Sequence, residues 1–384
     1  MTAKTIKGKS TEQIQSALQQ CMADGYKPTL AIVFMSVKQD HQAVCALLNH
    51  HNIQVFGATT AGEFIDSEIS EGGIVIMLLD LNPEYFKIVF YDIALSSEYD
   101  SAKQLGAAGK EVFHKPAFII ATGWMWGNNQ PDHEQIIQGI EEGSGGEPAI
   151  FGGVAGDEIT LVGPIVFNSD NSSISGLLAL IIDAEKVEVT GTATCGWKPI
   201  GITKTITKSE GNIVYTIDDQ PALDLVVRYL GINMEDLRAV AGSVVDIGAY
   251  YPWQLERTDA PAVMRTAQLG NLEDRSLICA GKVPQGSLIR FSLPPDFDVI
   301  DTVVEECSNL NIKSSREADA VIMFSCIARY VSFGALASEE LERVMQVWNA
   351  PFIGFYSYGE FGKSNRGKHE FHNNTCCVVA LKEK

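Results

Sequence analysis

Three short turns rich in glycine, each ending in a carboxylate, carry side chains suited to holding a small ligand. The turns span 57–63, 152–157 and 354–360; the first and third share the spacing Gly-x4-Gly-Glu-Phe, and the second ends in Asp and is one residue shorter. Glycine supplies positive φ and lets a backbone approach a ligand closely. The competing interpretation is a plain connection between strands, in which the carboxylate accepts hydrogen bonds from loop amides.

A second group of candidate side chains follows the apolar segment 320–325. Arg329 could clamp a ligand carboxylate with two parallel hydrogen bonds, or it could form a structural ion pair with Glu360 or Glu63. Cys326 is a weaker candidate nucleophile, because it lacks the Cys-x5-Arg spacing of a phosphatase loop and has no histidine beside it in the sequence.

Two further side chains stand near the ends of expected strands. Trp124 follows the segment 117–122 and could stack on a ligand or only cap the sheet edge. His372 precedes the last strand and could be a ligand or an axial residue of haem, although a histidine next to asparagine and threonine is more often a hydrogen-bonded loop residue. The sequence holds no CxxC pair and no His-x3-His pattern, so we expect no metal site.

The elements that must position these residues form a pattern that occurs three times. A buried strand, a helix, a short second strand, the turn and a further apolar strand follow one another in each copy. The first strands are 29–36, 117–122 and 320–325, the second strands are 54–56, 148–151 and 351–353, and the strands after the turns are 73–79, 176–182 and 376–381. A strand–helix–strand order predicts parallel pairing with a right-handed crossover. The expected fold is α/β, with three repeated βαβ units in mixed, mainly parallel sheets.

The region between the second and third copies has a different pattern. Alternating polarity at 187–207, a short helix at 221–230 and two strand-like stretches at 246–265 and 275–292 indicate antiparallel strands joined by turns. We therefore expect an inserted antiparallel region.

The turns and the first-strand ends should share one edge, because ligands bind beyond the carboxyl ends of parallel strands. This placement predicts a ligand-binding rim and no catalytic residues. The expected rim consists of Thr59, Thr60, Gly62, Glu63, Gly123, Trp124, Asp157, Cys326, Arg329, Tyr358, Gly359 and Glu360.

Composition narrows the possible partners. The net charge of −19 argues against binding to nucleic acid or to anionic lipid, both of which attract Lys and Arg. The longest apolar run, 176–182, is too short for a membrane span. The eight cysteines are scattered along the chain, a pattern typical of proteins whose thiols stay reduced. We expect a soluble cytoplasmic protein, monomeric or a small oligomer such as a homodimer.

With these residues in view, the chain resembles the FIST family of sensory domains over most of its length. Segments 56–63, 152–157 and 195–201 resemble the FIST N module, which we expect at 29–220. Segments 280–287, 324–329, 353–360 and 371–375 resemble the FIST C module, which we expect at 221–384. Each motif alone is weak, but the motifs in this order are specific as a set.

The resemblance implies a sensor for intracellular signal transduction that binds a small ligand, such as an amino acid. Family members are often fused to output modules; the chain ends without one, so we expect a separate partner such as a histidine kinase or a cyclase. Some members of similar size are haem-binding nitric oxide sensors, which makes haem a possible cofactor with His372 as its axial candidate. Two alternatives stay open: an enzyme using Cys326 and Arg329, and a purely structural interaction protein.

Overall fold

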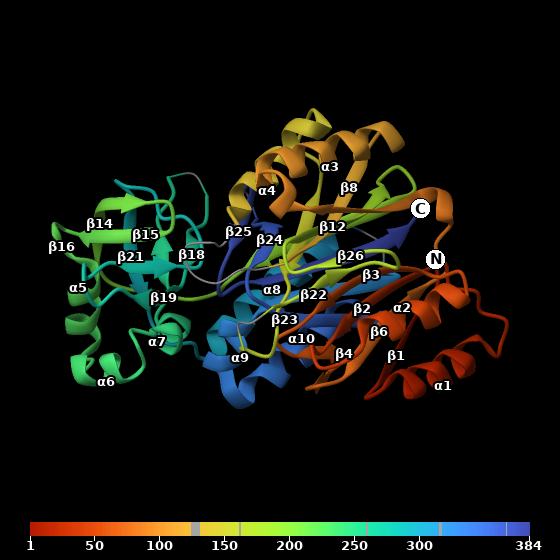
Figure 1. Cartoon of the computed structure of the whole chain (residues 1–384), viewed down its shortest axis with the longest axis horizontal. Coiled ribbons are helices and arrows are strands. Elements are labelled where there is room, and N and C mark those ends of the chain that lie inside the picture. The colour runs from red at the N-terminus through yellow and green to blue at the C-terminus, as the bar shows by residue number, and fades with distance from the viewer. Residues whose placement is uncertain (124–130, 161–162, 259, 315–316, 366) are drawn as a thin grey trace.

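The computed structural model describes residues 1–384 except 124–130, 161–162, 259, 315–316 and 366. It has two lobes (Figure 1): a body of three six-stranded sheets, and a smaller lobe, drawn in green at the left, built around an eight-stranded sheet. Both termini lie in the body, where the amino group of Met1 forms an ion pair with Glu383. No helix in the described part of the chain is both long and apolar enough to cross a membrane.

The body consists of three repeats with one order of elements. The first repeat contains β1 (Ala3–Gly8), α1 (Thr11–Met22), β2 (Leu30–Met35), α2 (His41–His50), β3 (Gln54–Thr59), β4 (Glu63–Ile65), β5 (Glu68–Ser70) and β6 (Ile74–Leu79). The second contains β7 (Phe86–Asp92), α3 (Glu98–Val112), β8 (Pro116–Thr122), α4 (His133–Ser144), β9 (Ile150–Val154), β10 (Val166–Phe167), β11 (Ser172–Ser173) and β12 (Gly176–Asp183).

The third repeat is interrupted by the smaller lobe. It contains β13 (Val187–Thr194), α8 (Phe297–Ser314), β22 (Ala320–Cys326), α9 (Ile327–Phe333), α10 (Ala337–Trp348), β23 (Phe352–Ser357), β24 (Glu360–Lys363), β25 (His369–His372) and β26 (Cys376–Glu383). The lobe inserted between β13 and α8 contains β14 (Pro199–Glu210), β15 (Ile213–Ile217), β16 (Gln220–Pro221), α5 (Ala222–Leu230), α6 (Met234–Ala239), α7 (Val245–Tyr250), β17 (Trp253–Leu255), β18 (Val263–Arg265), β19 (Ala267–Gly270), β20 (Leu277–Cys279) and β21 (Leu288–Ser292).

The hairpin after each turn leaves its own repeat and joins the sheet of another. β4 pairs with β23, β24 pairs with β9, and β10 pairs with β3, all antiparallel. The sheets therefore have equivalent orders, β1-β6-β2-β3-β10-β11, β7-β12-β8-β9-β24-β25 and β13-β26-β22-β23-β4-β5. This exchange ties the three repeats into a closed ring.

The mixed α/β class, the three βαβ units and the inserted antiparallel region are all confirmed. The sheets are less parallel than the sequence led us to expect, since each six-stranded sheet contains one parallel pair, β2–β3, β8–β9 or β22–β23. Strands joined by a helical crossover run parallel, whereas the exchanged hairpins and the returning last strands pair antiparallel.

A glycine lies opposite a phenylalanine where each exchanged hairpin joins its new sheet. The pairs are Gly57 with Phe167, Gly354 with Phe64, and Gly152 with Phe361. A Cβ added at Gly57 would lie 2.2 Å from the Phe167 ring, so the ring occupies the space that a side chain would need. Gly57 and Gly354 thus leave room for a phenylalanine ring from another repeat, whereas a Cβ on Gly152 would meet Ile120 O.

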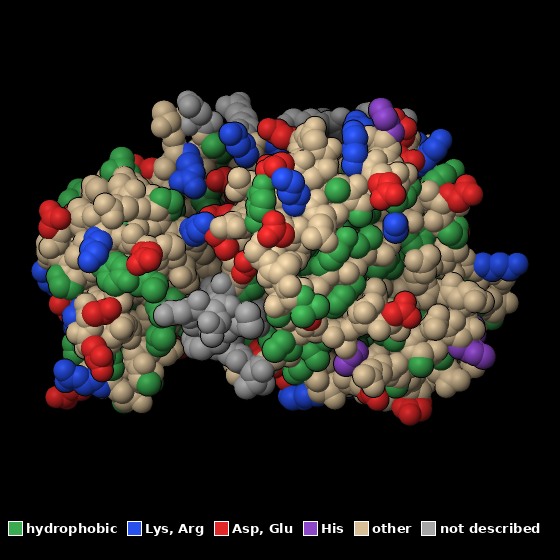
Figure 2. All heavy atoms as spheres, turned by 45° about the horizontal axis from the view of Figure 1, so that its top comes forward, with side chains coloured by type: hydrophobic (Ala, Val, Ile, Leu, Met, Phe, Trp, Pro, Cys, Tyr) green, Lys and Arg blue, Asp and Glu red, His purple; other side chains and the backbone are tan. Residues whose placement is uncertain are grey.

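Local signals set the limits of the helices that cover the sheets. Asp40 and Asp132 cap α2 and α4 by accepting hydrogen bonds from the helix backbone. Gly145 ends α4 with a φ of 69°, a conformation that glycine adopts without strain. Basic and acidic side chains are interspersed on the face of both lobes that Figure 2 shows.

Candidate functional site

The three turns meet at the centre of the body. Gly156 N donates to Thr59 O at 2.9 Å, Ala61 N donates to Tyr356 O at 3.0 Å, and Val154 N donates to Gly359 O at 2.8 Å. The convergence expected from the repeats is therefore present. The turns face one another across a packed interior, because Thr59, Thr60, Glu63, Asp157, Cys326, Tyr358 and Glu360 each expose 7% of their surface or less.

The first and third turns hold their carboxylates in the same way. Thr60 Oγ1 donates to Glu63 Oε2 at 2.9 Å, and Ser357 Oγ donates to Glu360 Oε1 at 2.7 Å. Glu63 also accepts a hydrogen bond from Gly73 N at 2.6 Å. Burial raises the pKa of Glu63 to about 7 and raises the pKa of Glu360 well above its usual range.

The second turn uses its carboxylate to bind the third. The Tyr358 hydroxyl donates to Asp157, and Gly163 N donates to Asp157 Oδ2 at 3.0 Å. Burial and the nearby carboxylate raise the pKa of Tyr358. Gly62 continues the pattern, because its carbonyl accepts from Tyr356 N at 2.8 Å. The predicted rim residues of the turns thus bind mainly one another.

Cys326 lies beside Glu360 in the same interior. Burial and the Glu360 carboxylate raise the pKa of the Cys326 thiol well above its usual range, and the residue exposes 4% of its surface. A buried neutral thiol is a poor nucleophile, because the thiolate is the reactive form.

Arg329 is fully buried on α9. Its Nε and Nη2 donate to Glu340 on α10, while Nη1 donates to Cys195 O at 2.7 Å and Asn374 O at 3.0 Å. The sequence suggested Glu360 or Glu63 as an ion-pair partner, and Glu340 takes that place. One signal for it was available: Glu340 lies four residues before Val344, on the buried face of the helix.

Two predicted rim residues lie away from the turns or cannot be placed. Gly123 N donates to Gly176 O at 2.8 Å, and a Cβ added at Gly123 would lie 1.8 Å from Ile174 O, so its role is to admit a close strand crossing. Trp124 lies outside the described residues.

A cleft of about 560 Å³ lies where the smaller lobe meets the body, a common setting for small-ligand sites. Its lining comes from β13 and the linker after it, from the smaller lobe, from α8, and from the β24–β26 region. The lining residues are Ala193, Thr194, Cys195, Gly196, Trp197, Gln254, Pro261, Ala262, Met264, Thr302, Glu306, Ser364, Asn365, His372 and Thr375. A second hollow of about 180 Å³ shares Glu306, Ser364 and Asn365 with it.

Two buried arginines hold one wall of this cleft from opposite sides. Arg265, from the smaller lobe, donates to Phe371 O at 3.1 Å and also bonds to a carboxylate of the body. Arg329, from the body, donates to Asn374 O. The segment between these carbonyls carries His372 into the cleft wall, and burial lowers the pKa of His372 to about 4, so that its imidazole is neutral at pH 7.

Trp197 forms part of the facing wall. Its ring stacks on Phe333 with centroids 5.6 Å apart, and the Arg329 guanidinium lies 5.0 Å from the ring centroid. Gln254 Nε2 donates to Trp197 O at 2.8 Å. The indole N–H of Trp197 is buried and has no hydrogen-bond partner among the described residues. Both walls are thus held by hydrogen bonds, and the Trp197 N–H has no partner among the described residues; both features suit a preformed ligand site.

Comparison with known families matched two domains along the chain. The FIST N domain matches residues 29–220, and the FIST C domain matches residues 222–363. The chain belongs to the FIST family. A comparison with curated proteins gave no match. FIST domains are sensory domains of signal transduction that bind small ligands.

The cleft draws on both FIST matches. Cys195 and Trp197 lie in the FIST N match, and Gln254, Met264 and Glu306 lie in the FIST C match. Sequence reasoning missed the last three, because Gln254 and Met264 lie in a non-repeating lobe and Glu306 is an ordinary acid on a helix. It named His372, which does line the cleft.

Haem, which the FIST resemblance implied, does not fit His372 in this cleft. More than half of the described lining residues are polar. A porphyrin needs a broad apolar slot beside its axial ligand, and the walls near His372 carry Thr375, Ser364 and Gln254 instead.

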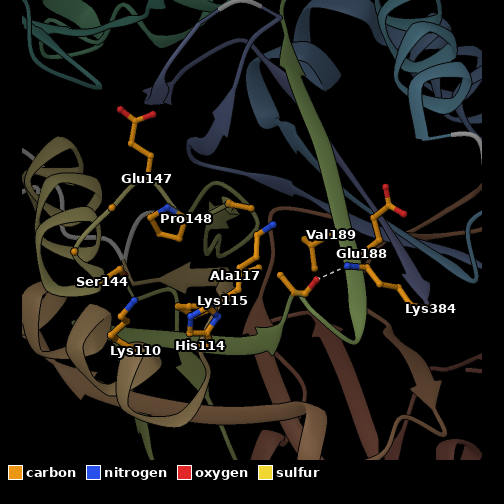
Figure 3. A pocket seen from close by; sticks show the side chains of 15 residues that line it. Lys110, His114, Lys115, Ala117, Ser144, Glu147, Pro148, Glu188, Val189 and Lys384 are labelled. Carbon is orange, nitrogen blue, oxygen red and sulfur yellow. Dashed lines mark hydrogen bonds between the residues drawn. The ribbon is translucent and has the colours of Figure 1, made fainter.

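A larger hollow of about 900 Å³ lies elsewhere on this FIST chain, at the amino ends of β8 and β9 (Figure 3). Lys110, Lys115 and Lys384 surround it together with Glu147 and Glu188. Lys110 lies in the last turn of α3, where a cation offsets the negative end of the helix, and Lys384 Nζ donates to Ala184 O at 2.6 Å, so two of these lysines already have structural roles. We therefore place the candidate site in the cleft between the lobes.

Proposed function

We propose that this FIST protein senses a small organic ligand in the cleft between its lobes and reports binding to a signalling partner, such as a histidine kinase or a cyclase. The observation that carries this proposal is the wall at Phe371–Asn374, which Arg265 and Arg329 hold from opposite lobes. A rigid wall with His372 facing the cleft suits specific binding, because a preformed site spends little free energy on ordering.

The same arginine offers a route from the cleft to the surface. Arg329 bonds to Cys195 O in the cleft lining and to Glu340 on α10. A ligand that favours one position of the linker would therefore change the position of α10, provided that it binds the two arrangements with different affinity. We infer that α10 and its neighbours form the surface that a partner protein recognises.

The proposed setting is the cytoplasm. All eight cysteines are free, and several of them, including Cys307 and Cys377, are buried. Thiols in such numbers persist unpaired in reducing compartments.

An enzyme that uses Cys326 and Arg329 receives less support from the geometry. The thiol is buried and protonated, and the guanidinium already donates to Glu340 and to two backbone carbonyls. A substrate would find neither group free to react or to bind it.

A thermal-shift screen over neutral, cationic and anionic metabolites tests the proposal, because a ligand that binds the folded state raises the melting temperature. Ala262→Trp places a bulky ring in the cleft from a partly exposed position. Leu95→Trp, at a site that is 86% exposed, is the matched control. We expect hits that vanish with Ala262→Trp and persist with Leu95→Trp; hits that survive Ala262→Trp would place the site elsewhere.

A further inference from the structure

Glu306 is the charged side chain that the described lining presents to the cleft. It extends from α8, it lines both the 560 Å³ cleft and the adjoining hollow, and it has no ion-pair partner among the described residues. Two other acids of α8 are paired, Asp298 with Lys198 and Asp301 with Arg343, while Glu305 is exposed and outside the cleft lining. Among these acids of α8, Glu306 is therefore the one that both lines the cleft and has its charge available to a ligand.

Two of the other polar side chains of the cleft, those of Gln254 and His372, offer hydrogen-bond acceptors. Gln254 donates both amide protons to the protein, to Trp197 O and to Ser292 Oγ, which leaves its amide oxygen as the group it can offer. His372 is neutral, and its Nε2 lies near Gly362 O, so Nδ1 remains as an acceptor. Acceptors of this kind bind the N–H groups of a ligand.

The cationic side chains near the cleft either already donate to protein groups or lie outside the main cleft. Arg265 and Arg329 lie behind the wall and donate to Glu134, Glu340 and backbone carbonyls. Lys363 lines the adjoining hollow, where it is exposed. A negatively charged ligand in the main cleft would thus meet a carboxylate without a nearby described cation to offset it.

An apolar surface completes the cleft. Met264 and Trp197 are buried, and Pro261 and Ala262 stand beside them on the smaller lobe. A hydrocarbon or aromatic portion of a ligand would be removed from water there, at about 25 cal/mol for each Å² buried.

We propose that the cleft takes a small organic amine, with its positively charged nitrogen at Glu306 and its apolar portion against Met264 and Pro261. This inference rests on the proposed function, since it names the class of ligand for the same cleft. It differs from the amino acid implied by the family resemblance, because it requires no carboxylate on the ligand.

Three probes of one shape test it by isothermal titration of the full-length protein: phenethylamine as the cation, 2-phenylethanol as the neutral molecule and 3-phenylpropionate as the anion. We expect phenethylamine to bind best, and Glu306→Gln to weaken it about tenfold, as for the loss of a charged hydrogen bond. The matched control is Glu305→Gln, which removes the same charge from the exposed neighbouring position of α8 and should leave phenethylamine binding unchanged.

Three outcomes would overturn the inference: tighter binding of 3-phenylpropionate, equal binding of 2-phenylethanol, or an equal loss with Glu305→Gln, which would indicate attraction to the acidic surface only. The proposed function is judged separately. If the metabolite screen gives hits that Ala262→Trp abolishes while phenethylamine does not bind, the cleft is a ligand site and the amine is the wrong class. If neither binds there, both proposals fail.

Discussion

The centre of the body is formed by repeated segments of the chain, whereas the cleft between the lobes depends on an inserted lobe that is not repeated. At the centre, three similar turns bond to one another, and Gly–Phe pairs such as Gly57 with Phe167 lock the exchanged hairpins. At the cleft, the linker at Cys195 and the third repeat's wall at His372 meet an inserted lobe that has no counterpart in the other repeats. The comparison teaches that the repeated signature encodes closure of the fold, whereas the candidate site lies where the repeat is broken.

Burial shifts ionisable groups in opposite directions in the two regions. Carboxylates at the centre have raised pKa values, and the imidazole in the cleft wall has a lowered one. In both cases the neutral form is favoured, because burial penalises charge. Stability at the centre and at the cleft should therefore respond to pH with opposite sign.

The largest expected effect comes from removing the carboxylate that pairs with Arg329 behind the cleft wall. Glu340→Gln leaves the buried Arg329 without its counter-ion, and loss of one partner of a buried pair costs about 3–5 kcal/mol. Urea unfolding measures this loss. Glu342→Gln, on the exposed face of the same helix, should change the free energy of unfolding little. A comparably small loss for Glu340→Gln would show that the Arg329–Glu340 pair does not stabilise the fold.

The next effect tests the centre through pH. Because the pKa of Glu63 is raised from 4.5 to about 7, the folded state binds its proton more tightly, and stability is lost as pH rises from about 4.5 through 7. The contribution is on the order of 3 kcal/mol. Glu63→Gln should flatten this slope in urea unfolding at pH 5 and pH 8, whereas the exposed Glu84→Gln should not. An unchanged slope in Glu63→Gln would mean that this carboxyl is not held neutral.

The cleft should show the reverse slope. The pKa of His372 is lowered from 6.5 to about 4, so the unfolded state binds the proton first, and stability is lost as pH falls from about 6.5 through 4. The shift corresponds to about 3 kcal/mol at most. His372→Gln should reduce the loss seen between pH 7 and pH 4, with the exposed His114→Gln as control. If both variants lose stability like the unaltered protein, His372 is not buried in the wall.

The smallest effect compares two copies of the same turn. Thr60→Val and Ser357→Ala each remove the hydroxyl that donates to the carboxylate three residues later, at a cost of about 1–2 kcal/mol. Both variants should retain ligand binding in the cleft, because the turns are structural. A variant that keeps its stability but loses ligand binding would indicate that the ligand binds at the turns and not in the cleft.

Repetition and local patterns made much of the fold predictable. Apolar runs identified β2, β8 and β22, and three copies of one order indicated the βαβ units. The exchange of hairpins was not predictable, because the pattern of a strand does not specify which repeat supplies its neighbour. The same limit applies to the turns, whose shared edge was foreseen and whose packing against one another was not.

The candidate site was predictable only in part. His372 was singled out as one histidine among asparagines, and Arg329 was recognised as important, with the wrong choice of carboxylate. Glu306 and Met264 gave no signal, since an acid on a helix and a methionine in a short strand are common. Their meaning depends on an insertion that brings segments distant in sequence to one cleft.

Methionine methyl NMR tests the central claim most directly. Met264 lines the cleft, whereas Met323 lies in β22 in the interior of the body. With the strongest hit of the metabolite screen added to protein carrying ¹³C-methyl methionine, we expect the Met264 signal, assigned with Met264→Leu, to shift at saturation while the Met323 signal stays in place. A shift of Met323 with an unchanged Met264 signal would contradict the assignment of the cleft as the sensing site.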